Sequence, residues 1–268
     1  MDAAELADRW RERLEAWAIP EKILAAAPAD PWSHSPARFA ARTDRALAEP
    51  DDGPTMTRLA EALPKGGTLL DVGSGPGASS LPLRDRIGHL YAVDTSPAML
   101  AEIATRADKL GVPLTTVEGC WPDVASGLPE ADVTICAHVV YNVPDLAGFL
   151  RALNAHSRRR VVLELPHRHP MSWTTPLWQH FHGVNRPVRP VAEDCVALVA
   201  ALGYGVRVEE REAPLERFTT LHDLAVSACR RLCLDQSRAD EVAETAEELG
   251  MWPLPRERWV TIWWDRRE

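Results

Sequence analysis

The stretch at residues 69–80, LLDVGSGPGASS, decides how this chain folds. An apolar run ends on Asp71 and passes directly into a loop containing Gly73, Gly75 and Gly77, followed by a segment rich in alanine and serine. This order predicts a buried strand, a tight turn and the start of a helix. Such a turn lets a ligand approach bare backbone, and free N–H groups at a helix start favour its anionic or strongly polar parts. We therefore expect the functional site at this turn.

A second acid follows the next apolar run, LYAVD at residues 90–94. Asp94 comes about 20 residues after the glycine loop, the position of an acid that binds the ribose hydroxyls of a nucleotide or adenosyl ligand. Because GSGPGA also satisfies the dinucleotide fingerprint, the two motifs alone leave both cofactor classes open. An adenosyl compound is favoured by Asp71 at the strand tip, by the segment DTSPAML that begins at Asp94, and by a final strand pattern suited to an antiparallel edge.

Together these motifs make residues 69–142 resemble the class I S-adenosylmethionine-dependent methyltransferases. The resemblance implies a Rossmann-like α/β fold, with a seven-stranded, mostly parallel sheet, an antiparallel last strand, helices on both faces and a helical cap. It also implies S-adenosyl-L-methionine as the cofactor and methyl transfer as the reaction. The fourth-strand segment AHVVYNVPD lacks the N/D-P-P-Y pattern of enzymes that methylate nucleic-acid or glutamine amino groups, so the group resembled acts on small molecules.

The resemblance assigns cofactor-binding residues along these motifs. Asp71 and the glycine loop would surround the aminoacyl end, Asp94 would bind the ribose, and Met99 would either face the adenine or lie in the core. Where many family members place an acid for the adenine amino group, this chain has Cys120, so neighbouring groups or packing would hold the adenine. The expected set is Asp71, Gly73, Ser74, Gly75, Gly77, Asp94, Thr95, Met99, Gly119, Cys120, Trp121 and His138.

Candidate catalytic side chains follow the fourth strand. The resemblance places His138 where that strand runs out beneath the methionine end of the cofactor. Tyr141 follows on the loop that would face the acceptor. The alternative for His138 is a structural histidine whose ring nitrogens are satisfied within the fold.

Two H-x-H pairs, at residues 167–169 and 180–182, lie in a long polar and aromatic stretch. We take His167 and His180 as candidates for a general base or an acceptor ligand. The alternative is that these histidines cap backbone groups. Because Glu164 is the only acid near them in the sequence, and divalent-ion sites that hold a diol are rich in oxygen ligands, no metal site is expected.

The reaction implied by the resemblance places few demands on the protein. It must align an acceptor atom, exclude water, and remove a proton if the acceptor is a hydroxyl or an acidic carbon. Ten tryptophans, of which Trp173 and Trp178 lie in the stretch that contains the H-x-H pairs, favour a small apolar or aromatic acceptor with an oxygen, nitrogen or carbon as the attacking atom. Two alternatives remain, an NAD(P)-dependent oxidoreductase and a non-catalytic regulatory protein that binds S-adenosylmethionine.

The composition restricts the possible binding partners and the cellular location of the protein. A net charge of −9 and a pI near 5.5 argue against nucleic-acid binding, which needs clustered positive charge. No apolar stretch is long enough for a membrane span, and the acidic N-terminus MDAAELADRW is unlike a signal peptide. The five cysteines form no C-x-x-C pair, which predicts reduced thiols. We expect a cytoplasmic monomer or homodimer.

Periodicity divides the chain into two regions. Residues 1–65 carry helical patterns and predict an N-terminal helical cap. Residues 66–268 form the predicted class I methyltransferase domain, in which apolar runs alternate with helical segments. Two parts of this domain would cover the site, a lid loop at about 166–190 and a helical insertion at about 219–250.

Overall fold

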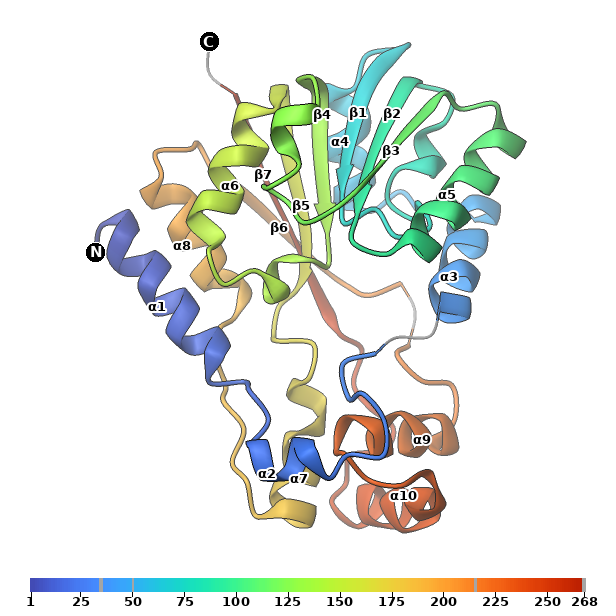
Figure 1. Ribbon diagram of the computed structural model, residues 1–268, viewed down its shortest axis with the longest axis vertical. Coiled ribbons are helices and arrows are strands. Elements are labelled where there is room, and N and C mark those ends of the chain that lie inside the picture. Colours follow the sequence, from blue (N-terminus) through green and yellow to red (C-terminus); the bar gives the residue numbers. More distant parts are fainter. Residues whose placement is uncertain (34–35, 50, 215, 267–268) are drawn as a thin grey trace.

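A seven-stranded sheet in the order β3-β2-β1-β4-β5-β7-β6 forms the upper part of the molecule (Figure 1). The computed structural model describes residues 1–33, 36–49, 51–214 and 216–266. β7 runs antiparallel to both its neighbours, β5 and β6, and the other pairs are parallel. The strands are β1 (Gly67–Val72), β2 (Ile87–Asp94), β3 (Leu114–Glu118), β4 (Ala131–Ala137), β5 (Ser157–Pro166), β6 (Arg207–Glu212) and β7 (Arg258–Asp265). The predicted fold class is therefore confirmed.

The sheet is covered on both faces because its central strands are apolar on both sides. Neighbouring residues of a strand point to opposite faces, so Leu69 and Leu70 enter different cores. On the Leu70 side lie α1 (Ala3–Glu15), α6 (Leu146–Ala155) and α8 (Ala192–Ala201). On the Leu69 side lie α4 (Pro54–Ala62) and α5 (Pro97–Leu110).

The segment after the glycine loop is not the helix that its alanines and serines predict. β2 already begins at Ile87, and residues 73–86 form turns and one 3-10 turn at Leu81–Leu83. Pro82 has no N–H to donate, so a helix that began in the loop could not continue through it. The helix α3 (Pro36–Ala48), which comes from the N-terminal region, packs against this 3-10 turn and against α5 (Figure 1).

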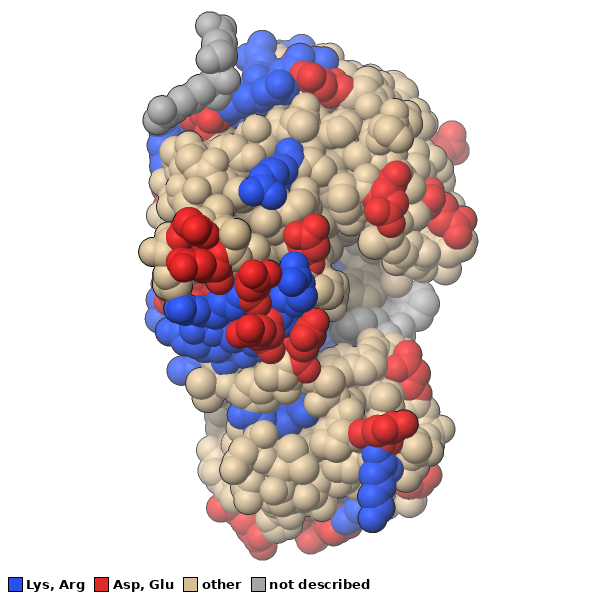
Figure 2. Space-filling view, turned by 60° about the vertical axis from the view of Figure 1, so that its left-hand side comes forward, with Lys and Arg blue, Asp and Glu red and all other residues tan. Residues whose placement is uncertain are grey.

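A second, smaller core lies below the carboxyl ends of the parallel strands. We call it the lower lobe: α2 (Glu21–Ala25), α7 (Thr175–His182), α9 (Leu221–Arg231) and α10 (Ala239–Glu248) (Figure 1). The space-filling view shows the molecule indented between this lobe and the sheet (Figure 2). No helix within the described ranges is long and apolar enough to cross a membrane.

The regions expected to cover the site are distributed differently from the prediction. The predicted lid loop contains α7, whose Leu177 and Trp178 are buried in the lower lobe, so it is an integral part of that core. The predicted insertion supplies α9 and α10 to the same core. The residues expected to form one N-terminal cap lie in three places: α1 and α4 on the sheet, α2 in the lower lobe, and α3 beside α5.

Candidate functional site

The glycine loop is fastened to the tip of β2. The N–H groups of Gly73 and Ser74 donate to the carbonyl oxygen of Val93, at 2.8 and 3.0 Å. Gly75 N–H donates to Asp94 Oδ2 at 2.8 Å, and Asp94 Oδ1 accepts from Ser96 N–H at 2.9 Å. Asp94 therefore fixes both the loop and the start of α5, which brings the two predicted motifs into direct contact.

The loop is packed tightly on one side and open on the other. A Cβ atom on Gly73 would lie 2.2 Å from Val139 Cγ2, and one on Gly77 would lie 2.7 Å from Leu81 Cδ1. A Cβ on Gly75 would meet nothing within 4 Å, although its φ of +50° still favours glycine. The backbone at Gly75 is therefore accessible to a ligand.

Asp71 lies beneath this loop with an incomplete hydrogen-bond shell. Its side chain is 1% exposed, and its Oδ2 has no hydrogen-bond partner within the described part of the chain. Burial raises the pKa of the Asp71 carboxyl to about 7, an effect opposed by the Ser80 hydroxyl and reinforced by the charge of Asp94. A cationic ligand group would supply the missing partner and favour the ionised carboxylate.

The tips of β2 and β3 lie together beside the loop. Gly119 N–H donates to the Asp94 carbonyl oxygen at 3.1 Å, and Gly119 has a φ of +151°. Thr95 and Cys120 are exposed at this edge, and Met99 is partly exposed in the first turn of α5. These residues form an accessible surface that extends from the glycine loop.

Trp121 does not share this exposed position. Its side chain is buried in the main core and its ring packs edge-on against His156, with ring centroids 5.1 Å apart. The ring stabilises the end of α6, where His156 lies, and is turned away from the accessible edge formed by Cys120. The sequence could not distinguish these two neighbours, because a short segment after a strand has no fixed periodicity.

His138 follows β4 in a left-handed conformation, with a φ of 60°. Its neighbour Val139 is the residue that packs against Gly73, so His138 lies close to the glycine loop. His138 Nε2 lies 3.0 Å from Glu164 Oε1, and the imidazole is 22% exposed. A left-handed backbone is costly for a non-glycine residue, and the surrounding contacts must hold it in place.

Glu164 is the buried anion behind His138. Its Oε2 accepts from the Thr55 hydroxyl at 2.7 Å and lies 3.6 Å from the Arg211 guanidinium. Burial by itself would raise the pKa of the Glu164 carboxyl, but His138, Thr55 and Arg42 outweigh that effect and lower the pKa to about 2. Glu164 is therefore ionised at neutral pH.

The hydrogen bonds and pKa shifts indicate one tautomer of His138. Burial, followed by the positive charge of Arg42, lowers the pKa of His138, so the ring is neutral at pH 7 and carries one N–H. Because Glu164 is an anion, we assign that proton to Nε2, which donates it to the carboxylate. Arg42 Nη2 can only donate, so its 2.9 Å contact with the protonated Nε2 is not a hydrogen bond. Nδ1 then carries a lone pair, and it has no hydrogen-bond partner in the described ranges.

Arg42 and Trp259 complete the surroundings of His138. Arg42 Nη2 lies 2.9 Å from His138 Nε2 and 3.9 Å from Glu164 Oε1, and the guanidinium lies 5.0 Å over the Trp259 ring. The His138 ring meets the same tryptophan edge-on at 4.7 Å. We did not predict Arg42 or Trp259, because only the folded chain brings α3 and the start of β7 to the end of β4.

The other predicted catalytic residues lie apart from this group. The Tyr141 hydroxyl donates to the carbonyl oxygens of Pro166 and His167, at 3.0 and 3.2 Å, and its ring stacks on Trp10. His167 Nε2 lies 3.2 Å from Glu193 Oε1. His180 is exposed on α7 in the lower lobe. The proposal below therefore rests on His138.

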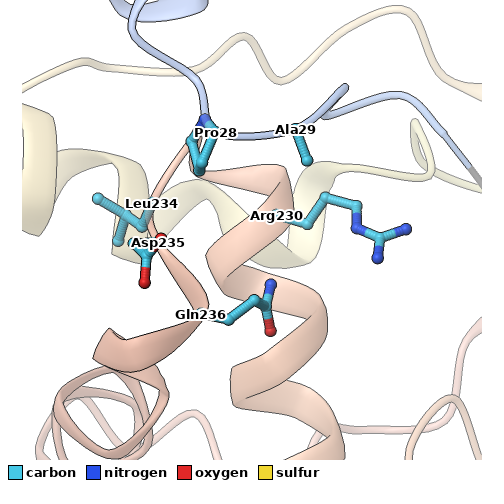
Figure 3. A pocket seen from close by; sticks show the side chains of 6 residues that line it. All are labelled: Pro28, Ala29, Arg230, Leu234, Asp235 and Gln236. Carbon is cyan, nitrogen blue, oxygen red and sulfur yellow. The ribbon is translucent and has the colours of Figure 1, made fainter.

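Two hollows lie elsewhere on the molecule. One of about 210 Å³ in the lower lobe is lined by Pro28, Ala29, Arg230, Leu234, Asp235 and Gln236. Figure 3 shows the side chains of Arg230 and Asp235 pointing away from each other, so polar groups do not converge there. The other, of about 270 Å³, lies between α3 and α5 and is lined in part by Arg106 and Lys109. Neither contains a residue of the predicted site. Nor does any cluster of three or more His, Cys, Asp or Glu suited to a metal ion occur among the described residues.

Residues 69–159 match a protein family described as "Methyltransferase domain". An uncharacterized protein of Haemophilus influenzae is 35% identical over 96 residues, which are 35% of this chain and 35% of that protein. The ubiquinone biosynthesis O-methyltransferase of Azorhizobium caulinodans is 32% identical over 87 residues, covering 32% of this chain and 34% of that protein. This chain thus spans about a third of the length of the curated relatives it matches.

Solved structures share the fold over most of the chain. A methyltransferase of Geobacter sulfurreducens in complex with S-adenosyl-L-homocysteine is 22% identical, with a TM-score of 0.53 and coverage of 86% of this chain and 98% of that one. The magnesium protoporphyrin IX methyltransferase of Synechocystis is 14% identical, with a TM-score of 0.51 and coverage of 100% of both chains. These likenesses extend the shared fold well beyond the segment matched in sequence.

Proposed function

We propose that this chain is a class I S-adenosylmethionine-dependent methyltransferase, which transfers the cofactor's methyl group to a small acceptor bound between the sheet and the lower lobe. The match of residues 69–159 to a methyltransferase-domain family and the shared fold support this proposal. The family and the cofactor are those expected from the glycine loop and Asp94. The proposal also includes the acceptor, the roles of individual residues, a cytoplasmic location and a monomeric or homodimeric state.

The observation that carries the proposal is the buried, unpartnered oxygen of Asp71 beneath an open glycine loop. S-adenosylmethionine carries an ammonium group that would complete this hydrogen-bond shell and offset the burial of the carboxylate. Asp94, which lies beside Gly75 and Gly119, would bind the ribose hydroxyls with the lone pairs that its backbone contacts leave free. Met99 and Cys120 would border the adenine.

His138 is the proposed general base. When bound, the cofactor supplies an electrophilic methyl group. Nδ1 of the neutral imidazole would accept the proton of an attacking hydroxyl or other acidic group. Glu164 acts as a positioning residue, since its carboxylate holds the N–H on Nε2 and stabilises the positive charge that the ring would acquire.

The surroundings of His138 favour a flat acceptor. Trp259 is partly exposed at this position, with His138 edge-on to its ring and the guanidinium groups of Arg42 and Arg211 over the ring. Aromatic rings stack in offset or edge-on arrangements, so a small aromatic acceptor would pack on this surface. The Azorhizobium relative is named for O-methylation in ubiquinone biosynthesis, which supports a hydroxyl as the attacking group.

Calorimetric titration tests the proposal. S-adenosylmethionine and S-adenosyl-L-homocysteine should bind the wild-type chain, and NAD should not. Asp94→Ala should weaken binding of both adenosyl ligands about tenfold to a hundredfold, because it removes charge-assisted hydrogen bonds. Asp108→Ala, an exposed aspartate on the outer side of α5, is the matched control and should bind normally. Binding of NAD alone would overturn the proposal.

A further inference from the structure

Arg42 has hydrogen-bond donors that the protein does not use. A guanidinium carries five N–H donors. In the described part of the chain its sole polar contact at hydrogen-bond distance is His138 Nε2, an atom that donates its own hydrogen to Glu164. The carboxylate of Glu164 lies 3.9 Å away, which is an ion-pair distance and not a hydrogen bond. The Arg42 side chain is 35% exposed, so its free donors can reach a ligand.

Arg38 lies one helical turn before Arg42 and therefore on the same side of α3. It donates to the carbonyl oxygen of Arg217 at 3.0 Å and lies 5.5 Å over the Phe218 ring. No ion pair to a carboxylate is formed by Arg38 in the described ranges. Burial, then the positive charges of Arg217 and Arg42, lower the pKa of Arg38.

Two nearby arginines, in contrast, form short ion pairs. Arg211 forms a two-pronged ion pair with Asp51, and Arg217 pairs with Glu257 at 2.5 Å. Arg38 has no such ion pair among the described residues, and Arg42 has only the 3.9 Å contact with Glu164, a carboxylate that also lies 3.6 Å from Arg211. Two guanidinium groups on one helix face repel each other, and a bound anion would offset that repulsion.

We propose that the methyl acceptor carries a carboxylate group, separate from its reacting atom, which binds to Arg42 and Arg38. This inference rests on the proposed methyl transfer. Arg42 adjoins both His138 and Trp259, so a carboxylate held there would place the rest of a flat acceptor against the tryptophan and within reach of the imidazole. A planar carboxylate matches the fork of a guanidinium. A phosphate is disfavoured, because its second negative charge would lie near the anion of Glu164.

Matched pairs of ligands test this inference. With S-adenosyl-L-homocysteine at saturation, calorimetry compares hydroxybenzoates with the corresponding hydroxybenzamides, which have the same shape and no charge, and with hydroxyphenyl phosphates. We expect at least one hydroxybenzoate to bind about tenfold or more tightly than its amide, as charged hydrogen bonds warrant. Arg42→Gln should abolish that preference and Arg38→Gln should reduce it. Arg45→Gln, on an exposed position of the same helix, should retain it.

The outcomes separate the two proposals. If S-adenosyl-L-homocysteine fails to bind the wild-type chain, the proposed function fails. If it binds with unchanged affinity in Arg42→Gln, the cofactor site is intact and the acceptor data can be read directly. Four results would overturn the carboxylate inference alone. The acid and the amide could bind equally, the phosphate could bind more tightly, or none of the hydroxybenzoates could bind. The fourth is an unchanged preference for the acid in Arg42→Gln.

Discussion

The sheet and the lower lobe are built from the sequence in different ways. The strands proposed to hold the cofactor, β1 to β4, follow one another along the chain, and all but the first two residues of β1 lie in the segment at residues 69–159 that matches the methyltransferase family. The lower lobe is assembled from three separated pieces, α2, α7 and the pair α9 and α10. The proposed cofactor side is therefore specified by continuous motifs, whereas the lower lobe depends on contacts between distant parts of the chain.

This difference suggests a division of roles. The groups proposed to hold the cofactor, Asp71 and Asp94, belong to the sheet and its loops. Arg42 and Trp259, proposed to face the acceptor, lie on α3 and β7, outside the family-matched segment. Substitutions in the two regions should therefore separate cofactor binding from acceptor binding.

The largest expected effects come from two matched core leucines. Leu90 in β2 and Leu224 in α9 are both fully buried. Replacing either by alanine should reduce the free energy of unfolding by about 2–5 kcal/mol, measured in denaturant. Leu90→Ala should also weaken S-adenosyl-L-homocysteine binding, while Leu224→Ala should leave it within about twofold. A large loss of cofactor affinity in Leu224→Ala would contradict the division of roles.

Glu164→Gln should have an intermediate effect that depends on pH. The pKa of Glu164 falls from 4.5 to about 2 on folding, so its stabilising contribution is complete above about pH 4.5 and is lost as pH falls toward 2. The variant should lose about 1–3 kcal/mol of unfolding free energy at pH 7. This deficit should shrink below about pH 4.5. Glu212→Gln, on the exposed edge strand β6, is the control and should show neither change.

The same variant tests the positioning role of Glu164. Glu164 raises the pKa of His138, so removing its charge should lower that pKa. The increase of the methylation rate with pH should then occur at a lower pH. The rate at saturating substrate should fall more than about tenfold, with cofactor affinity unchanged. An unshifted pH profile would leave Glu164 a purely structural residue.

The smallest expected effect lies at the contact between α1 and α8. Arg13 pairs with Asp194 at 2.6 Å, and both side chains are partly exposed. Arg13→Ala should lower the unfolding free energy by about 0.5–1 kcal/mol, and added salt should reduce the difference. Asp194 retains its contact with Arg189. A loss comparable with that of Leu90→Ala would mean that α1 is essential to the sheet core.

Local sequence patterns predict the sheet well. The predicted seven-stranded sheet is present, and the segment DTSPAML begins α5, with Ser96 as its cap and Pro97 in the first turn. These features depend on residues near one another in the chain. The helix expected after the glycine loop is absent, since Pro82 and the early start of β2 exclude it. One proline can prevent a helix even in a segment rich in alanine and serine.

The candidate site was only partly predictable. Asp71, Asp94 and His138 could be found because each ends an apolar run or follows one, and parallel strands bring such ends to one edge. Arg42 gives no local signal, since one arginine on an amphipathic helix resembles any solvated charge. For Tyr141 the sequence was misleading. Its position after the fourth strand predicted a residue that faces the acceptor, but its ring packs in the core against Trp10.

The placement of β7 between β5 and β6 has a consequence for biosynthesis. β6 leaves the ribosome before β7, its one partner strand in the described sheet, and residues 213–257 must be made before β7 can pair with it. During that interval both edges of β6 are open to pairing with other nascent chains. Its sequence, RVEERE, has five charged side chains in six positions. That charge would keep the waiting strand from aggregating, which explains why so polar a segment is tolerated in the sheet.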